Sequence, residues 1–528
     1  MTAPRTRTAF DRDQARARLG AESFDVLVIG GGITGAGVAL DAAARGLRTA
    51  LVERDDFASG TSSKSSKLVH GGLRYLQQKE YFLVYENLAE RQRLLNNAPH
   101  LVSVLPFLIP LFGRSGVVNK TVAKAYRTAL FLYDVTGGLR IGKRHKRLTI
   151  DEAIAHMPTL NRDLLAAGFL YYDAQADDAR LTLTITRTAV LDHGAVALNY
   201  APVAGVLKDG SGNARGVALA DGLEIQADVV VNATGVWADN VRALDEATHP
   251  DTIRPAKGIH IALPWDKVRC DIATVVPVPK DRRSIFVVPW GDRVYLGTTD
   301  TDYTGPIDDP QCTPEDVDYI INALNMFVTE PVSASDVLGT WAGLRPLIKQ
   351  AGNERTADLS RRHSVNTSAS GMITVTGGKL TTYRKMAEDT VDAAVKQLGR
   401  GRATRKCPTK RLPLRGAAPT EGDLGLPGDV AAHLRSRFGS EARVVAAMLE
   451  ADPELGRPLV ATLPYLRAEA VYAARYEMAH TLDDVLSRRT RAVLLARDAA
   501  DAAAADVANL LASELGWTPE ETDHQVRT

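Results

Sequence analysis

The chain has 528 residues, of which 45% are hydrophobic and 24% charged, and its formal net charge is +1. This balance is typical of a soluble globular protein of two or three domains, without general attraction to nucleic acid. Its three cysteines lie far apart, which excludes a disulfide framework or zinc site and favours a reducing, cytoplasmic setting. Residues 1–20 indicate a polar tail rather than a signal peptide, and no apolar run reaches the ~20 residues that span a bilayer.

Residues 24–53 predict a nucleotide-binding unit of strand, glycine turn, helix and strand. The apolar run 24–29 suits a buried parallel strand, and the glycines after it match G-x-G-x-x-G. Such glycines permit a sharp turn, a close approach to a pyrophosphate and tight packing of the helix 33–44. A second strand, 48–52, ends in an acid that can accept the ribose hydroxyls of an adenosine. The residues expected at the dinucleotide are Gly30, Gly32, Ile33, Thr34, Gly35 and Glu53.

The glycine motif alone leaves open whether the nucleotide is NAD or FAD. Residues 57–77 collect hydroxyls, glycines and lysines, which offer many hydrogen-bond donors to phosphates and ring carbonyls. A flexible polar loop would have a similar composition. This run, however, ends in His-Gly-Gly-Leu-Arg-Tyr and passes straight into an amphipathic helix, and a disordered linker there would cut the nucleotide unit in two.

The run TSSKSSKLVHGGLRYL, residues 61–76, resembles the flavin-binding segment of the FAD-dependent, quinone-linked glycerol-3-phosphate dehydrogenases. These enzymes belong to the larger group of D-amino-acid oxidase-like flavoproteins. The resemblance implies FAD as the cofactor. It also implies an α/β fold in which an FAD-binding Rossmann-like domain is interleaved with a mixed-sheet substrate domain and followed by an all-α domain. The residues it adds at the flavin are Thr61, Ser62, Ser63, Ser66, Lys67, Leu68, His70, Gly71 and Gly72.

The next segments predict alternating helices and strands. Residues 81–98 are helical by period, the run 101–112 reads as a buried strand rather than a membrane-dipping loop, and a helix is expected near 123–133. The basic cluster 143–147 is most simply a solvated loop. A helix at 181–193 and strands within 196–206, 216–219 and 222–225 follow. They lead to an apolar strand ending in Ala233, Thr234 and Gly235, a turn that lies beside the adenosine half of the cofactor in related flavoproteins.

Three later motifs also resemble the family. The Lys-Gly-Ile-His element 257–260 places His260 on a strand facing the flavin, and the Gly-Leu-Arg-Pro-Leu element 343–347 carries Arg345. In the segment 373–384 a strand ends in two glycines and a helix begins at Thr381. The positive end of that helix, placed near the N1–C2 carbonyl edge, would stabilise the anionic reduced flavin. The residues expected here are Gly378, Lys379, Leu380 and Thr381.

Cations adjoin each of the flavin-facing motifs, and converging Arg and Lys side chains suit a phosphate. The resemblance implies oxidation of sn-glycerol 3-phosphate to dihydroxyacetone phosphate, with hydride passing from C2 to flavin N5. His260 is the candidate base because an imidazole titrates near neutral pH, Arg345 could stabilise the alkoxide, and Arg74 is a third catalytic candidate; which one takes the proton is left open. The substrate pocket implied by the resemblance is lined by Arg74, Tyr75, His260, Arg345, Arg361 and Lys379.

The expected partners are sn-glycerol 3-phosphate and a quinone, and no nucleic acid or metal; a homodimer is left open. Because a quinone resides in the bilayer, a cytoplasmic protein of this kind should contact the inner face of the membrane, where basic residues near 140–147 or 402–415 could contribute. Three alternatives remain: an oxidase that reduces dioxygen, a D-amino-acid-oxidase-like enzyme for another hydroxy or amino acid, and a flavin-holding scaffold without turnover.

The sequence predicts five parts. They are an N-terminal tail (1–20), a discontinuous FAD-binding domain (21–98, 166–250 and 350–398), a substrate-binding domain (99–165 and 251–349), a linker (399–423) rich in Gly, Pro and Arg, and a C-terminal helical domain (424–528). Helices are expected at 468–486 and 492–515, and their apolar positions suit the core of a bundle.

Overall fold

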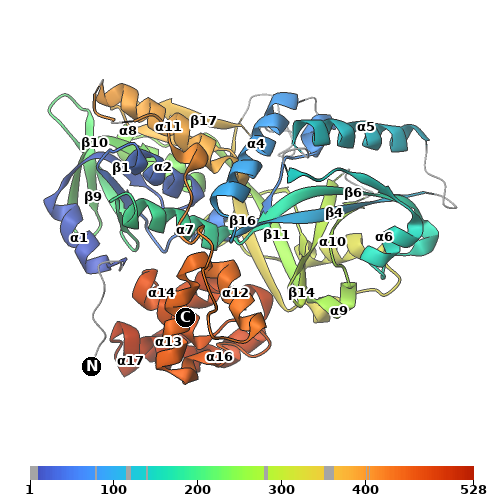
Figure 1. Cartoon of the computed structure of the whole chain (residues 1–528). Coiled ribbons are helices and arrows are strands. Elements are labelled where there is room, and N and C mark those ends of the chain that lie inside the picture. Colours follow the sequence, from blue (N-terminus) through green and yellow to red (C-terminus); the bar gives the residue numbers. More distant parts are fainter. Residues whose placement is uncertain are drawn as a thin grey trace.

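Two β-sheets and a helical C-terminal unit make up the fold (Figure 1). The computed structural model describes residues 10–77, 80–113, 120–137, 141–278, 283–349, 362–399, 401–403 and 405–528, except the side chains of Arg74, Gln77 and 120–123. In Figure 1 the first sheet lies on the left, the second on the right, and the C-terminal helices below them. Among the described residues, no helix is long and apolar enough to cross a membrane.

The first sheet, sheet A, is parallel at its centre. Its order is β17-β18-β10-β1-β2-β7, with β9 and β8 continuing antiparallel from β10. The residues 24–29 of β1 and all four residues of β2 are buried, and α2, which packs against the sheet, contacts both α7 and α11. Burial on both faces explains why these strands read as unbroken apolar runs. The bounds are β1 Ser23–Ile29, β2 Thr49–Val52, β7 Val196–Leu198, β8 Val203–Lys208, β9 Ala214–Leu219, β10 Glu224–Asn232, β17 His363–Thr367, β18 Ile373–Gly377, α2 Ile33–Ala44, α7 Asp178–Leu191, α8 Ala238–Glu246 and α11 Tyr383–Leu398.

The second sheet, sheet B, is mixed. Its order is β15-β11-β14-β13-β12-β4-β6-β3, with β16 paired to β11 and β5 to β6. Alternate residues of β4 enter different cores: Phe107 and Ile109 pack in the core that includes α4 and α5, and Leu108 in the core that includes α6 and α10. The strands are β3 Leu68–Val69, β4 Val102–Phe112, β5 Lys146–Leu148, β6 Leu165–Ala176, β11 Ile253–Pro264, β12 Ala273–Val278, β13 Arg283–Trp290, β14 Arg293–Gly297, β15 Thr301–Asp302 and β16 Gly339–Ile348. The helices are α3 Arg74–Gln77, α4 Tyr81–Asn97, α5 Lys120–Thr136, α6 Ile150–His156, α9 Trp265–Val268 and α10 Pro314–Asn325.

Two expected boundaries differ from the structure. The segment 166–250 was assigned to the FAD-binding domain, but β6 is an interior strand of sheet B, paired with β4 from Val102↔Ala176 to Phe112↔Leu165. The long β4, buried on both faces, needs an antiparallel partner along its whole length. The tail 1–20 also folds in part, because α1 (Arg12–Ala21) buries Leu19 in the core of sheet A.

The C-terminal unit contains α12 (Gly428–Phe438), α13 (Ala442–Ala451), α14 (Arg467–Tyr476), α15 (Ala492–Leu495), α16 (Arg497–Leu515) and α17 (Pro519–Arg527). The expected helix 468–486 is wrong, because α14 ends at Tyr476 and only Asp484–Arg489 continues, as a π-helical turn. Met478 takes a left-handed backbone, with φ of 53°, and buried Asp484 accepts hydrogen bonds from the backbone N–H groups of His480 and Thr481. The expected helix 492–515 is interrupted at Ala496, between α15 and α16.

Candidate functional site

The glycine turn connects β1 to α2 at the carboxyl edge of sheet A. Gly30 has φ of +106°, and a Cβ on it would lie 2.8 Å from the carbonyl oxygen of Ala233; a Cβ on Gly35 would lie 1.8 Å from the oxygen of Gly30. A side chain is therefore excluded at both positions. Gly32 caps α2 without a side-chain hydrogen bond of its own, the N–H of Ile33 donates to Ser62 Oγ over 2.9 Å, and Gly32, Ile33 and Thr34 line the neighbouring cavity. A helix N-terminus presented in this way is suited to bind a pyrophosphate.

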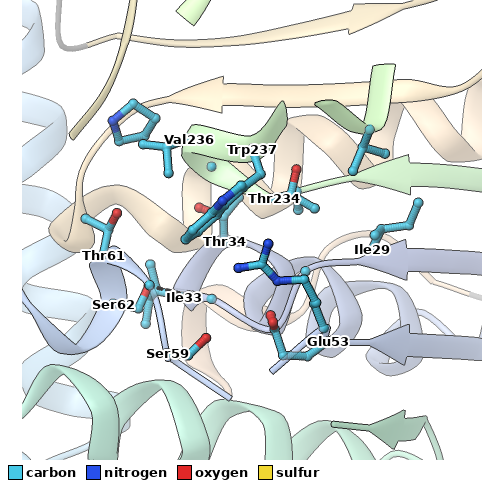
Figure 2. Close-up of a pocket in the computed structure, with 18 of the residues that line it drawn as sticks. Ile29, Ile33, Thr34, Glu53, Ser59, Thr61, Ser62, Thr234, Val236 and Trp237 are labelled. Atoms are coloured by element: carbon cyan, nitrogen blue, oxygen red, sulfur yellow. Dashed lines mark hydrogen bonds between the residues drawn. The ribbon is translucent and has the colours of Figure 1, made fainter. Parts of the chain in front are cut away.

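The first cavity, of ≈ 340 Å³, adjoins this turn. Figure 2 shows Thr34, Glu53, Thr61 and Trp237 around the same space, although they come from distant parts of the chain. The sequence-predicted residues that line it are Gly30, Gly32, Ile33, Thr34, Glu53, Thr61, Ser62, Ala233, Thr234, Gly235, Gly378, Lys379 and Leu380. The two glycine-bearing turns and the 233–235 turn are thus brought together at one edge of sheet A.

Glu53 lies at the end of β2, as expected for an acid facing a ribose. Its Oε2 accepts a hydrogen bond of 2.5 Å from the N–H of Gly31, and its Oε1 accepts one of 2.9 Å from the N–H of Asp55. Burial raises the pKa of Glu53, although both backbone hydrogen bonds oppose that effect. The carboxylate therefore also locks the glycine turn to the loop that follows β2.

Arg54 and Trp237 are among the lining residues that the sequence did not predict. The guanidinium of Arg54 lies 4.9 Å from the ring of Trp237, and the indole Nε1 of Trp237 donates to Asp308 over 2.8 Å. Both side chains line the first cavity and offer it a flat, partly cationic wall. The only sequence signal was the position of Trp237, two residues after the Ala-Thr-Gly turn.

The second cavity, of ≈ 480 Å³, continues from the first. The two share Thr61, Pro346, Gly378, Lys379 and Leu380 in their linings. The other sequence-predicted residues that line it are Ser66, Leu68, His70, Gly72, Tyr75, His260, Arg345 and Thr381. A nucleotide in the first cavity could therefore extend into the second along the segment 377–381.

Some residues predicted at the cofactor lie behind the cavity walls. Lys67 is only 2% exposed, and its Nζ donates to Asp178 over 3.0 Å and to the carbonyl oxygen of Ser63 over 3.1 Å. The N–H of Gly71 donates to Asp173 over 3.1 Å. Gly35 likewise packs on the glycine turn. Each of these residues packs against buried neighbours, and its contact with the cofactor stays a prediction. The Arg74 side chain and all of Arg361 lie outside the described residues.

The pairing of β11 with β16 builds the wall of the second cavity. Along one face, His260 pairs with Trp341, Gly258 with Gly343, and Ala256 with Arg345. A Cβ on Gly258 would lie 2.5 Å from the guanidinium Nη2 of Arg345. The glycine therefore makes room for the Arg345 side chain beside His260, which explains why a glycine precedes each functional residue in the two motifs.

His260 is buried and neutral. It is 2% exposed, its ring stacks on Trp341 with centroids 4.9 Å apart, and its Nε2 lies 2.9 Å from the Oγ of Ser66. Its Nδ1 has no hydrogen-bond partner among the described residues. Burial lowers the pKa of His260 well below its ordinary value, and the charges of Lys67 and Arg345 lower it further. The imidazole is thus in its proton-accepting form at neutral pH.

Cationic side chains gather on the same side of the cavity. Arg345 donates to Asp300 Oδ1 over 3.2 Å and to Thr298 Oγ1 over 3.0 Å, which fixes its guanidinium. The Nζ of Lys379 lies 3.9 Å above the ring of Tyr75. Arg283, for which the sequence held no local signal, lines the cavity as well. Such a set of cations suits a small anionic ligand such as a phosphate.

The opposite wall of the second cavity is apolar. It is formed by residues of β4, β6, β12, β13 and α5 that lie far apart in sequence. They are Phe107, Ile109, Tyr126, Tyr171, Val275 and Phe286. A cavity with one cationic and one apolar wall can take a polar substrate and a flat ring together. Among the described residues, no cluster of His, Cys, Asp and Glu could hold a metal ion.

These residues fit FAD. The N-terminus of α2 and the glycine cradle suit its pyrophosphate, Glu53 its ribose, and the segment 377–381 leads to a chamber large enough for a ring. The fold and the site together define a dinucleotide-binding oxidoreductase of the flavoprotein class.

Comparisons with known proteins agree with this class. The family described as FAD dependent oxidoreductase matches residues 25–384, and the C-terminal domain of alpha-glycerophosphate oxidase matches residues 407–522. Glycerol-3-phosphate dehydrogenase 2 of Mycobacterium tuberculosis is 41% identical, over 98% of this chain and 89% of the relative. The mitochondrial glycerol-3-phosphate dehydrogenase of Mesocricetus auratus is 39% identical, over 96% of this chain and 72% of the relative.

A solved structure agrees over the full length. The glycerol-3-phosphate dehydrogenase of Bacillus halodurans, complexed with FAD, has a TM-score of 0.80 and 33% identity, covering 98% of this chain and 96% of that one. The chain belongs to the FAD-dependent glycerol-3-phosphate dehydrogenase family, and FAD is its cofactor. A glycerophosphate oxidase from Mycoplasma pneumoniae, at 17% identity and a TM-score of 0.55, shares the fold alone.

Proposed function

We propose that this chain oxidises sn-glycerol 3-phosphate to dihydroxyacetone phosphate and passes the electrons to a quinone. The observation that carries the proposal is the cationic wall of the second cavity, where Arg345 and Lys379 lie beside neutral His260. The names of relatives that match nearly the full chain support the same substrate. When bound, FAD supplies a hydride acceptor at N5 and can release electrons singly.

The side chains of the second cavity have separate roles in the proposed oxidation. Lys379 and Tyr75 face the phosphate, for which a cation and a hydroxyl donor are suitable partners. Arg345, fixed by Asp300 and Thr298, holds the oxygen on C2 and stabilises the negative charge that develops there. His260 accepts the proton of the C2 hydroxyl, since its imidazole is uncharged and its ring lines the second cavity.

Steady-state turnover tests the substrate and the acceptor. Rates are measured with sn-glycerol 3-phosphate, glycerol, L-lactate and D-alanine, using a soluble quinone analogue as acceptor. We expect kcat/KM for glycerol to lie at least about 100-fold below that for the phosphate ester, because glycerol offers no anionic group to the cationic wall of the cavity. Efficient turnover of an amino acid would contradict the proposal. Peroxide formed in proportion to substrate would favour the oxidase alternative instead.

We further propose that the protein contacts a membrane through one face of α4 and α5. Phe82 on α4 is 71% exposed and Phe131 on α5 is 59% exposed, and neighbouring apolar residues enlarge this aromatic face. Its members are Tyr81, Phe82, Tyr85, Phe131, Leu132 and Val135. The residues Arg127, Phe131 and Val135 follow an i, i+4, i+8 stripe, whereas Tyr126 of the same helix lines the second cavity.

Charge supports an anionic lipid surface as the partner. The basic segment 143–147 is mostly exposed, and His145 ties it to α5 through Asp134. The expected contribution of residues 402–415 is weaker, because Arg402 pairs with Asp228 and Arg415 with Asp192. Because Tyr126 of α5 lines the second cavity while Phe131 and Val135 are exposed, α5 links the aromatic face to the flavin chamber.

Vesicle flotation tests this contact. Wild-type protein should float with vesicles that contain anionic phospholipid, and the double variant Phe82→Ser, Phe131→Ser should lose at least about tenfold in partitioning, given ~25 cal/mol per Å² of apolar area. Met326→Ser removes a side chain that is 53% exposed elsewhere and should leave binding unchanged. Equal flotation of all three proteins would refute the assignment.

A homodimer stays a prediction, for which light scattering is the measurement.

A further inference from the structure

Three arginines of the C-terminal unit lie close to the segment between β2 and β3, which borders both cavities. Arg488, Arg489 and Arg491 lie at the end of the π-helical turn Asp484–Arg489 and just after it. Arg489 is 2% exposed and Arg491 is fully buried. A buried guanidinium is unfavourable unless carboxylates and carbonyls surround it, so the identity of its partners is informative.

The first contact is with Asp56, three residues after Glu53. Arg488 Nε donates to Asp56 Oδ2 over 2.7 Å, and Arg489 donates to both oxygens of Asp56 over 2.6 and 2.9 Å. Burial alone would raise the pKa of Asp56, but the charges of Arg489 and Arg488 outweigh it and lower that pKa to about 2. The start of the segment between β2 and β3 is therefore held by a bidentate ion pair from the C-terminal unit.

The second contact is with Asp178 at the start of α7. Arg491 Nη2 lies 2.5 Å from Asp178 Oδ1, and its Nη1 donates to the carbonyl oxygen of Ser63 over 3.4 Å. Asp178 in turn accepts hydrogen bonds from the Oγ of Ser65 over 2.7 Å and from the Nζ of Lys67 over 3.0 Å. The carboxylate of Asp178 thus joins Arg491 of the C-terminal unit to Ser65 and Lys67 of the flavin loop.

The same loop orients the candidate base. Ser66, between the two residues that Asp178 binds, has its Oγ 2.9 Å from His260 Nε2. Lys67 lies with its Nζ 5.0 Å from the ring of Trp341, on which His260 stacks. A shift of Asp178 would therefore move Ser66 and Lys67, and with them the environment of the imidazole.

We infer that Arg491 is a positioning residue of the flavin site: through Asp178 it fixes the loop 61–67 and thereby His260. The C-terminal unit, which contributes no residue to either cavity lining among the described residues, completes the cofactor site from behind. The part of the inference that concerns His260 rests on the proposed function; the part that concerns cofactor retention does not.

The experiment compares Arg491→Met with Arg491→Lys in the full-length protein. We expect Arg491→Met to weaken FAD binding at least about tenfold, the effect of a lost charged hydrogen bond, and to alter the visible circular dichroism of bound flavin. At saturating FAD it should lower kcat more than it raises KM. Arg491→Lys should recover part of each effect. Arg475→Met is the matched control, because Arg475 pairs with Glu514 on the exposed side of the same unit.

A second variant covers the case in which Arg491→Met does not fold. Ser65→Ala removes the hydroxyl that donates to Asp178 and accepts from the N–H of Lys67, without leaving a buried charge uncompensated, and we expect it to raise the FAD dissociation constant about threefold or more. Wild-type FAD affinity and flavin dichroism in Ser65→Ala and in any folded Arg491 variant would overturn the inference. FAD binding needs no substrate, so failure of the proposed reaction and failure of this inference give different results.

Discussion

The two cavities are built in different ways, although they hold parts of one cofactor site. The first is made mainly of backbone turns at the edge of sheet A, and the largest group of its lining residues comes from the continuous stretch 29–62. The second is made of side chains that sheet B brings together from β4, β6, β11, β12, β13 and β16. The difference teaches that a nucleotide is recognised by local chain geometry, whereas a small substrate is recognised by a face of a sheet that distant strands must assemble.

The largest effect is expected from a substitution in the glycine turn that borders the first cavity. Gly35→Ala would place a Cβ 1.8 Å from the oxygen of Gly30, so the turn must open. We expect the purified variant to retain no FAD by absorbance. Gly205→Ala, at a glycine with nothing within 4 Å of the added Cβ, should retain it fully. Wild-type FAD content in Gly35→Ala would show that the packing of this turn does not determine binding.

The next effect is confined to the second cavity. Arg345→Met removes the guanidinium that Asp300 and Thr298 fix, and we expect kcat/KM for sn-glycerol 3-phosphate to fall about 100- to 1,000-fold, with FAD content unchanged. The exposed Arg16, paired with Asp221, supplies a control substitution to Met that should not alter turnover. A loss of FAD equal to the loss of turnover would mean that the two cavities are not separable in function.

A smaller effect is expected at the ribose acid. Glu53→Gln removes the charge that accepts the N–H groups of Gly31 and Asp55, and FAD affinity should fall about tenfold. At saturating FAD, kcat should equal that of the wild type, because Glu53 lies in the first cavity only. Glu22→Gln, at an exposed carboxylate that pairs with Arg18, is the control. Reduced kcat with FAD saturated would contradict the assignment.

The smallest effect concerns pH. Burial, with Lys67 and Arg345, lowers the pKa of His260 well below 6.5, so the base form persists until the pH falls through that low value. Because the phosphate of the substrate itself titrates near pH 6, the profile is measured as kcat at saturating substrate, and it should show no loss of activity near pH 6.5. In Arg345→Met one lowering charge is gone, and the acid limb should move upward toward neutral pH. An inflection near pH 6.5 in the wild type would show either that His260 is not the titrating base or that burial does not lower its pKa.

The same contrast explains how much could be predicted. The helix 33–44, the adjoining glycines and the position of Glu53 were predicted correctly, because apolar period, turn chemistry and spacing are all local. Arg54 and Arg283 were missed, since what makes them cavity residues is a neighbour brought in by the fold. Lys67 was misplaced for the same reason: its composition suits a phosphate, but Asp178, 111 residues away, binds it inward.

The break of the expected helix 468–486 has a related cause. Its residues have helical periodicity, but Glu477 is fully buried against Arg180, and the fully buried Asp484 accepts a hydrogen bond from the hydroxyl of Tyr200 over 2.6 Å, so distant parts of the fold hold both carboxylates. Tertiary ion pairs of this kind leave no pattern in the sequence. The family resemblance supplied His260, Arg345 and Lys379 as pocket residues, and sheet pairing then explained why they meet.

Anaerobic addition of sn-glycerol 3-phosphate to the purified, FAD-containing protein tests the central claim most directly. The account predicts that the visible flavin band bleaches with the phosphate ester, stays unchanged with glycerol, and returns when a quinone analogue is added. A chain that takes up no FAD, or a flavin band that sn-glycerol 3-phosphate leaves intact, would contradict it.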